Sequence, residues 1–136
     1  MFDVILVSHG PLAGAMLETA GLLCGEQERV KTFGFYPGDS IDEFFETICA
    51  SIDESLGRGE VLVITDIQLG SPFNVCCRAM AGRRFRHITG MSLPVVTQVL
   101  MDRRVMSATE VAASAVEKGR GCVVDVNELL ADVLDD

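Results

Sequence analysis

The sequence predicts an α/β fold, a three-layer sandwich in which helices cover both faces of a mainly parallel central sheet. Short apolar runs, too short to form helices, alternate with longer amphipathic segments that have helical spacing. The connections between successive strands are too long for hairpins, and parallel strands need such crossovers. Because crossovers are right-handed, the ends of the first, third and fourth strands should meet at one edge. The chain of 136 residues shows no repeat or linker, so residues 1–136 should form a single domain.

Two strand–helix units are expected in the first half of the chain. The apolar run 4–7 predicts the first strand. Pro11 suits the first position of the next helix, since its fixed φ matches a helix and it lacks an N–H that would be unsatisfied there. The alternating run 30–36 predicts the second strand, in which Gly34 marks a bend or a close approach. Ser40, with a glutamate three residues later, has capping-box spacing. The two helices are expected over 11–24 and 41–56.

The second half repeats this alternation and then departs from it. Strands are predicted over 61–64 and 85–90, each followed by a turn and a helix. Ser107 opens a further helix with a second capping box. Gly119-Arg120-Gly121 predicts a flexible joint before a fifth strand over 122–126. The helices are expected over 72–81, 94–101, 107–118 and 127–134.

Charge and hydropathy narrow the possible partners and location. A formal net charge of −9 argues against binding to nucleic acid or anionic lipid and favours a basic protein partner. No uninterrupted apolar stretch approaches the roughly 18 residues of a membrane-spanning helix. The amino terminus lacks the pattern of a signal peptide. We therefore expect a cytoplasmic protein with no direct membrane insertion.

The five cysteines do not suggest a metal site. They form no CxxC pair and have no histidine at ligand spacing, so we expect small buried apolar residues in a reducing compartment. The sequence also lacks the carboxylate cluster of a magnesium site and the glycine-rich loop that binds nucleotide phosphates. We expect no metal and no cofactor. The cysteines stand at positions 24, 49, 76, 77 and 122.

His9 is the first candidate for chemistry. It follows the first predicted strand and precedes a helix start, and ligands of open α/β sheets bind at that edge. The unpaired N–H groups of a first helical turn favour an anion such as phosphate. The hypothesis is that His9 is a nucleophile that becomes a phosphohistidine, and that it accepts the phosphoryl group less readily as falling pH protonates the imidazole. A satisfied structural histidine is the alternative.

A second constellation strengthens this hypothesis. Asp66 ends the third strand as His9 ends the first, and the turn Gly70-Ser71-Pro72 leads into a helix. If the two strands are neighbours, Asp66 can fix the His9 tautomer and stabilise the charge that develops on attack. Gly10, Gly70 and Ser71 would contact the phosphoryl group through helix N–H groups, and Ser71 also through its hydroxyl. The alternative is that Asp66 and Ser71 are ordinary helix caps.

Two other features invite structural interpretations. His87 lies within the fourth strand rather than at its end, so we expect a half-buried structural histidine. Arg78, Arg83, Arg84 and Arg86 form a local positive cluster on an acidic protein. Such a cluster is most simply a solvated edge, and the alternative is a surface that recruits a phosphorylated or acidic partner.

With these motifs in place, the chain resembles the enzyme IIA component of the mannose and fructose-type phosphoenolpyruvate-dependent sugar phosphotransferase systems, over essentially its whole length. In that family's loop an aromatic residue and a second glycine often precede Gly70, where this chain has Gln68 and Leu69. The resemblance rests on Ser8-His9-Gly10, Glu26-Gln27, Pro37-Gly38, Asp66 and the run Gly70-Ser71-Pro72-Phe73-Asn74.

The resemblance implies a phosphotransferase component with a phosphohistidine intermediate. His9 would accept phosphate from the histidine-containing phosphocarrier protein HPr and pass it to a IIB component for sugar uptake. Asp66 would orient His9, and Ser71 would contact the phosphoryl group. The fifth strand would lie antiparallel at the sheet edge and be exchanged between the subunits of a homodimer.

Two alternatives stay open at this point. One is a phosphohistidine regulatory protein or a phosphotransfer subunit of a dihydroxyacetone kinase, for which Gln68 and Leu69 leave room. The other is a non-catalytic flavodoxin-like module that binds a ligand at the same crevice. The sequence has no dinucleotide fingerprint, and it has no tryptophan to stack on a flavin, so the second alternative is the weaker.

Overall fold

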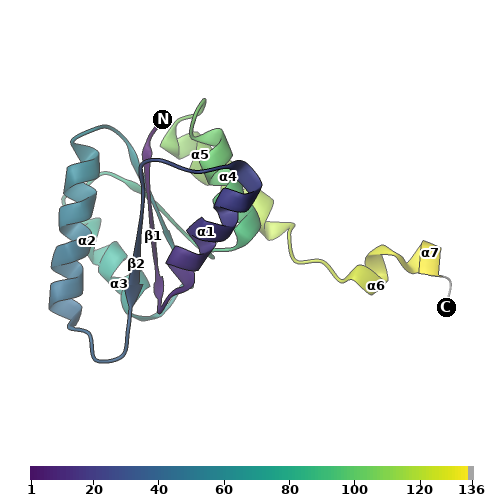
Figure 1. The fold of residues 1–136 in the computed structure, drawn as a ribbon, viewed down its shortest axis with the longest axis horizontal. Helices are drawn as coiled ribbons and strands as arrows, with labels where there is room; N and C mark the ends of the chain where they lie inside the picture. Colours follow the sequence, from purple (N-terminus) through teal and green to yellow (C-terminus); the bar gives the residue numbers. More distant parts are fainter. Residues whose placement is uncertain (135–136) are drawn as a thin grey trace.

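A four-stranded parallel sheet forms the centre of the molecule in the computed structural model, which describes residues 1–134 (Figure 1). The strand order is β2-β1-β3-β4, and every neighbouring pair is parallel. The predicted α/β class is therefore confirmed. The strands are β1 (Asp3–His9), β2 (Val30–Phe35), β3 (Val61–Thr65) and β4 (Arg86–Thr89).

Helices cover both faces of this sheet, as the sequence predicts. In Figure 1, α2 and α3 lie on one side, and α1, α4 and α5 lie on the other. Among residues 1–134, no helix has the length and apolar character needed to cross a membrane. The helices are α1 (Leu12–Cys24), α2 (Ile41–Leu56), α3 (Gly70–Ala79), α4 (Leu93–Asp102), α5 (Ala108–Arg120), α6 (Val126–Leu129) and α7 (Ala131–Leu134).

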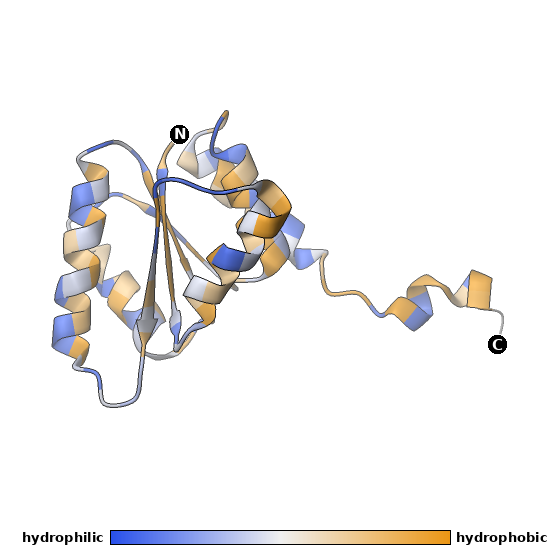
Figure 2. Ribbon diagram, viewed as in Figure 1, coloured by the Kyte–Doolittle hydropathy of each residue, from blue (hydrophilic) through white to orange (hydrophobic). Residues whose placement is uncertain are grey.

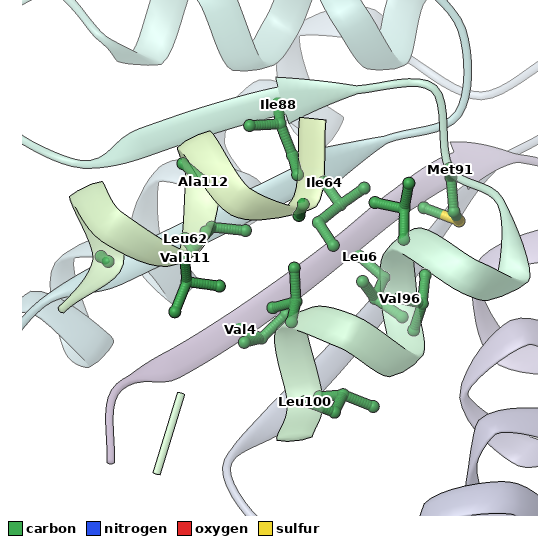
Figure 3. Packing of buried hydrophobic residues seen from close by; sticks show 14 of the residues in the cluster. Val4, Leu6, Leu62, Ile64, Ile88, Met91, Val96, Leu100, Val111 and Ala112 are labelled. Carbon is green, nitrogen blue, oxygen red and sulfur yellow. The ribbon is translucent and has the colours of Figure 1, made fainter. Parts of the chain in front are cut away.

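Residues of each strand alternate between two hydrophobic clusters. Leu6 and Ile64 point towards α4 and α5 and pack against residues such as Val96 (Figure 3). Their neighbours Val7 and Val63 pack on the opposite face with α2 and α3. Because both faces are covered, the central strands are continuous apolar runs rather than alternating ones. Each fully buried aliphatic side chain of this kind contributes about 1.5–3 kcal/mol.

The helix starts differ slightly from the predicted ones. Pro11 is the residue before α1 rather than its first residue, and the α1 turn is capped by Ser8, whose Oγ accepts from the Ala13 N–H at 2.8 Å. The third helix begins at Gly70, earlier than the expected residue 72, after an extended Leu69. The capping box at Ser107 is present in full. The carboxyl edge of the sheet therefore ends in short turns that lead directly into α1 and α3.

The cysteines are less uniformly buried than expected. Cys49 and Cys76 are buried, whereas Cys24 and Cys122 are half-buried and Cys77 is exposed. Adjacent residues on a helix point to different faces, which accounts for the contrast between Cys76 and Cys77. All five are free thiols.

The amino edge of the sheet is held by arginines. Asp3 is buried and forms ion pairs with Arg29 and Arg58. Arg103 is 1% exposed, and its guanidinium donates to the carbonyl oxygens of Phe2 at 3.0 Å and Glu28 at 2.6 Å. It also donates to the Arg29 carbonyl and to the Gln27 side chain. Arg103 thus supplies a donor to the backbone oxygens of Phe2 and Glu28, while the Arg29 oxygen also accepts from the Val4 N–H.

The carboxyl-terminal segment departs most from prediction. Gly119 and Arg120 belong to α5 rather than to a flexible joint. The single chain does not form the predicted fifth strand, because residues 122–125 have no regular structure and the sheet of residues 1–134 has four strands. A strand at an edge requires a neighbour, and this segment projects away from the sheet (Figure 1). We call residues 122–134 the C-terminal arm.

Candidate functional site

His9 occupies a tightly fixed turn between β1 and α1. It is the last residue of β1, and the following Gly10 has a φ of +54°, which allows the chain to reverse into the helix. The N–H of Gly10 donates to the carbonyl oxygen of Phe35 at 2.8 Å, which ties the turn to β2. The His9 side chain remains 43% exposed. A rigid backbone therefore presents an accessible imidazole at the carboxyl edge of the sheet.

Asp66 meets His9 although 57 positions separate them in sequence. The Asp66 Oδ2 atom lies 2.8 Å from His9 Nδ1 and accepts from the His9 backbone N–H at 2.9 Å. Parallel pairing of β1 with β3 brings the two strand ends together. A carboxylate accepts a hydrogen bond, so Nδ1 carries the proton and Nε2 keeps a lone pair. The arrangement leaves Nε2 free to act as a nucleophile.

The hydrogen bonds at Asp66 keep its side chain ionised. Burial alone would raise the pKa of this carboxyl, whose side chain is 7% exposed. Donation from the His9 backbone N–H, the His9 ring and the Ile67 N–H outweighs burial, so the pKa of Asp66 is lowered. The Ile67 N–H contacts the other carboxylate oxygen at 3.0 Å. An ionised carboxylate can both fix the imidazole tautomer and stabilise positive charge on the ring.

Gly70 lies directly against the reactive side of the imidazole. A Cβ built on Gly70 would lie 2.6 Å from His9 Nε2 and 2.9 Å from His9 Cε1, and its φ is +84°. Only glycine meets both conditions without strain. Since Gly70 is the first residue of α3, the amino end of that helix is next to Nε2.

Ser71 is half-buried at the same helix start. The first N–H groups of a helix have no intrahelical acceptor and favour an anion, so Gly70 and Ser71 could both donate to a group held at Nε2. The residue that precedes α3 is Leu69, which makes no side-chain cap. The carboxylate of Asp66 is engaged with His9 and Ile67. Neither Asp66 nor Ser71 is therefore an ordinary cap of this helix.

Gly10 differs from its expected role as an amide donor to phosphate. Its N–H is already bonded to the Phe35 carbonyl oxygen, so it is not free for another acceptor. The missing side chain of Gly34 lets β2 pack closely against this turn, since a Cβ on Gly34 would lie 2.2 Å from the Gly10 carbonyl oxygen. The close approach predicted at Gly34 is thus found here. What Gly10 contributes to the site is the shape of the turn.

Sequence reasoning missed the residues that hold Asp66 in place. Its carbonyl oxygen accepts from the Met91 N–H at 3.1 Å, and the carbonyl of the preceding Thr65 accepts from Gly90 at 3.2 Å. Thr65 is fully buried, and its Oγ1 lies 2.9 Å from Nε2 of His87. His87 is half-buried as predicted, and burial lowers its pKa. The available signal was a polar residue, Thr65, ending an otherwise apolar strand.

Comparisons with known proteins agree with this geometry. A sequence model of the family described as the PTS system fructose IIA component matches residues 3–116. The chain is 34% identical over 119 residues to the mannose-specific EIIAB component of Escherichia coli strain K12, covering 86% of this chain and 37% of that protein. It is 31% identical over 115 residues to the sorbose-specific EIIA component of Klebsiella pneumoniae, covering 81% of both. The chain thus spans 37% of the length of the mannose-specific relative, but most of the sorbose-specific one.

Solved structures show the same fold. One is the PTS IIA protein associated with the fucose utilization operon of Streptococcus pneumoniae, with a TM-score of 0.84 and 30% identity over 95% of this chain and 97% of that one. Another is the mannose/sorbose specific IIA subunit from Enterococcus faecalis, with a TM-score of 0.83 and 25% identity over 91% and 93%. Because the family model covers most of the sequence and these structures share its architecture, the chain belongs to the PTS system fructose IIA component family, EIIA-man.

Proposed function

We propose that the chain is a phosphocarrier of a sugar phosphotransferase system, which accepts a phosphoryl group on Nε2 of His9. The contact between His9 Nδ1 and Asp66 Oδ2 carries the proposal, because it leaves the lone pair of Nε2 as the reactive one. The proposed donor is the histidine-containing phosphocarrier protein HPr, and the proposed acceptor is a IIB component. The EIIAB name of the Escherichia coli relative, which joins A and B components, supports that acceptor. We place the carrier in the cytoplasm, with both partners.

The proposed transfer is an in-line displacement at phosphorus. The Nε2 lone pair forms a new P–N bond while the P–N bond to the donor histidine breaks, and the donor ring keeps the released electron pair. Positive charge develops on the His9 ring and is stabilised by ionised Asp66. The N–H groups of Gly70 and Ser71 and the Ser71 hydroxyl would bind the phosphoryl oxygens. Little other covalent chemistry is required of the protein.

The exposure of His9 suits this exchange between proteins. Its side chain is 43% exposed on a fixed backbone, so a second protein's histidine can approach Nε2 without an opening motion. A phosphohistidine at this position could then be presented in turn to the acceptor. Transfer should weaken at acid pH, because protonation of Nε2 removes the attacking lone pair.

Intact-mass measurement after incubation with phosphorylated HPr tests the assignment. The wild-type chain should gain the mass of one phosphoryl group, and the gain should disappear on acid treatment, since a P–N bond is acid-labile. The variant His9→Gln should gain none. The chain has two histidines, so His87→Gln is a matched control that should still be labelled.

Three results of this labelling experiment would contradict the proposed function. Equal labelling of His9→Gln and wild type would remove His9 from the mechanism. Loss of labelling in His87→Gln, with His9→Gln unaffected, would move the phosphoryl site to β4. Labelled wild type that fails to pass its phosphoryl group to any IIB component would leave acceptance intact and contradict the carrier role.

We also propose that the C-terminal arm forms the antiparallel fifth strand of a second copy, giving a homodimer. Two observations support this exchange: β4 is an edge strand, and residues 122–125 pair with no strand of their own chain among residues 1–134. Val123 is 96% exposed, and the rest of the C-terminal arm carries further exposed apolar residues (Figure 2). Sedimentation equilibrium of the full chain should show a dimer, and removal of residues 122–136 should give a monomer.

A further inference from the structure

A basic cavity lies at the amino end of β4, on the sheet edge remote from His9. Its volume is about 530 Å³, and its walls come from the loop before β4 and from the first turn of α5. The lining residues are Glu60, Val61, Arg83, Arg84, Phe85, Arg86, Ala108 and Thr109. We call this cavity the arginine pocket. Three cationic side chains in one cavity are unusual on a chain whose formal net charge is −9.

Two of these arginines are uncompensated. Arg83 is paired with Asp53 at 2.7 Å, and the Glu60 carboxylate accepts from the Ala108 N–H at 3.2 Å, so those two charges are engaged. Arg84 and Arg86 are exposed and form no ion pair within residues 1–134. The pocket therefore offers two free guanidinium groups, which match carboxylates in geometry.

The C-terminal arm has the complementary character. Glu128 and Asp132 are exposed, and neither carboxylate forms an ion pair in the described part of the chain. Leu129 is 68% exposed and Val133 is 77% exposed, so apolar and acidic residues alternate along the arm (Figure 2). A segment with this composition gains from docking where a basic cavity adjoins apolar surface.

The direction of strand pairing decides where these acids would lie. An antiparallel strand on the free edge of β4 runs from Thr89 towards Arg86, because β4 itself runs from Arg86 to Thr89. Residues 122–126 would cover β4 at about 3.3 Å per residue, and the residues after them would emerge at the arginine pocket. A parallel strand would instead carry the acids towards Asp66 and His9, where they would repel a phosphoryl group.

We propose that the arginine pocket binds the C-terminal arm of a second copy, with Glu128 and Asp132 of that copy paired to Arg84 and Arg86. This inference rests on the proposed antiparallel arm exchange and adds to it a docking site and a set of ion pairs. The arm of the same chain projects away from the sheet and its covering helices, which favours a second copy as the occupant (Figure 1). The pocket thus locks the register of the exchanged strand.

Sedimentation equilibrium of the full chain, at low and high salt, tests this inference. The double variant Arg84→Glu/Arg86→Glu should weaken the dimer at least about tenfold at low salt, since two ion pairs become repulsions. The double variant Glu128→Arg/Asp132→Arg should weaken it similarly. Combining all four changes should restore dimerisation. Arg104→Glu is the matched control, because Arg104 is exposed outside the pocket and its variant should dimerise as the wild type does.

Each other outcome overturns a distinct statement. A wild-type chain that stays monomeric overturns the arm exchange and this inference with it, while phosphorylation of His9 is unaffected. A dimer that tolerates Arg84→Glu/Arg86→Glu overturns the pocket as the docking site and leaves the exchange standing. A dimer weakened by both double variants but not restored by their combination shows that the arm is not the occupant of the pocket.

Discussion

Asp3 and Asp66 are buried aspartates at opposite edges of the same sheet, and they contact different kinds of side chain. Burial would raise the pKa of both, and hydrogen bonds lower the pKa of both below the ordinary value. Asp3 is paired with Arg29 and Arg58, which carry permanent charges. Asp66 is paired with His9, whose side chain is 43% exposed and whose second ring nitrogen is unoccupied.

The partner, rather than the carboxylate, therefore decides what each edge does. A guanidinium has no lone pair to offer, so the Asp3 network can only hold the amino edge together. An imidazole bonded through one nitrogen has a nucleophilic second nitrogen. The comparison predicts that changes at the amino edge should alter stability, whereas changes at the carboxyl edge should alter phosphoryl transfer.

Asp66→Asn should have the largest effect and should act on rate. The neutral amide stabilises the developing ring charge less, and its NH2 group must face a donor, either His9 or the Ile67 N–H. We expect phosphoryl transfer from HPr to fall by about 10²–10³-fold. Quench-flow measurement of labelled protein gives the rate, and thermal unfolding gives the stability. A rate within twofold of wild type would remove Asp66 from the chemistry.

Arg103→Met should have the next largest effect and should act on stability. The substitution keeps the apolar stem but leaves the carbonyl oxygens of Phe2 and Glu28 without this donor, whereas the Arg29 oxygen still accepts from the Val4 N–H. We expect a loss of about 3 kcal/mol in the free energy of unfolding, measured in urea. Arg104→Met is the matched control, because its side chain is exposed. Equal losses in the two variants would contradict a structural role for the buried guanidinium.

Gly70→Ala should lower both stability and the rate of phosphoryl transfer, and Gly82→Ala is the control that distinguishes the two effects. Gly82 has a φ of +79°, close to the +84° of Gly70, but a Cβ there meets nothing within 4 Å. Both alanine variants should lose about 1–2 kcal/mol of stability through backbone strain. Only Gly70→Ala should displace His9, and transfer should then fall by about 10²-fold. A rate for Gly70→Ala equal to that of Gly82→Ala would show that the ring tolerates the added methyl group.

Most of the sheet follows from local sequence, because its signals are local. The apolar runs ending at His9 and Asp66 are buried on both faces, so their periodicity identifies strands, and their crossover lengths identify parallel pairing. Capping residues such as Ser107 correctly predict where a helix begins. The fifth strand was not formed in the single chain, because an edge strand depends on a neighbour that its own sequence does not supply.

The candidate site likewise has features that the sequence predicts and features that depend on the folded chain. The pairing of His9 with Asp66 was predictable, since two equivalent strand ends converge once the strands are neighbours. The close contact between Gly70 and the His9 ring was not predictable, because it depends on the path that the turn before α3 takes in the folded chain. The engaged N–H of Gly10 likewise depends on β2, whose carbonyl at Phe35 is close only in the folded chain.

His87→Gln should give the smallest effect, on the pH dependence of stability. Burial lowers the pKa of His87 in the folded protein, so the unfolded chain takes up this proton at a higher pH. Lowering the pH below about 6.5 therefore favours unfolding, and stability is lost as the pH falls towards the folded pKa. A glutamine can still donate to Thr65 Oγ1 without titrating. Urea midpoints between pH 7.5 and 5 should fall less steeply for His87→Gln than for wild type.

The other histidine provides the comparison that makes this small effect decisive. His9 lies instead at the exposed edge of the sheet, where its Nδ1 contacts the carboxylate of Asp66. Burial beside Thr65 and Phe73 disfavours the charged ring of His87, whereas the side chain of His9 is 43% exposed. His9→Gln should therefore leave the acid-side loss of stability in place, and His87→Gln should reduce it. The reverse ranking would contradict the assignment of this acid-side loss to the burial of His87.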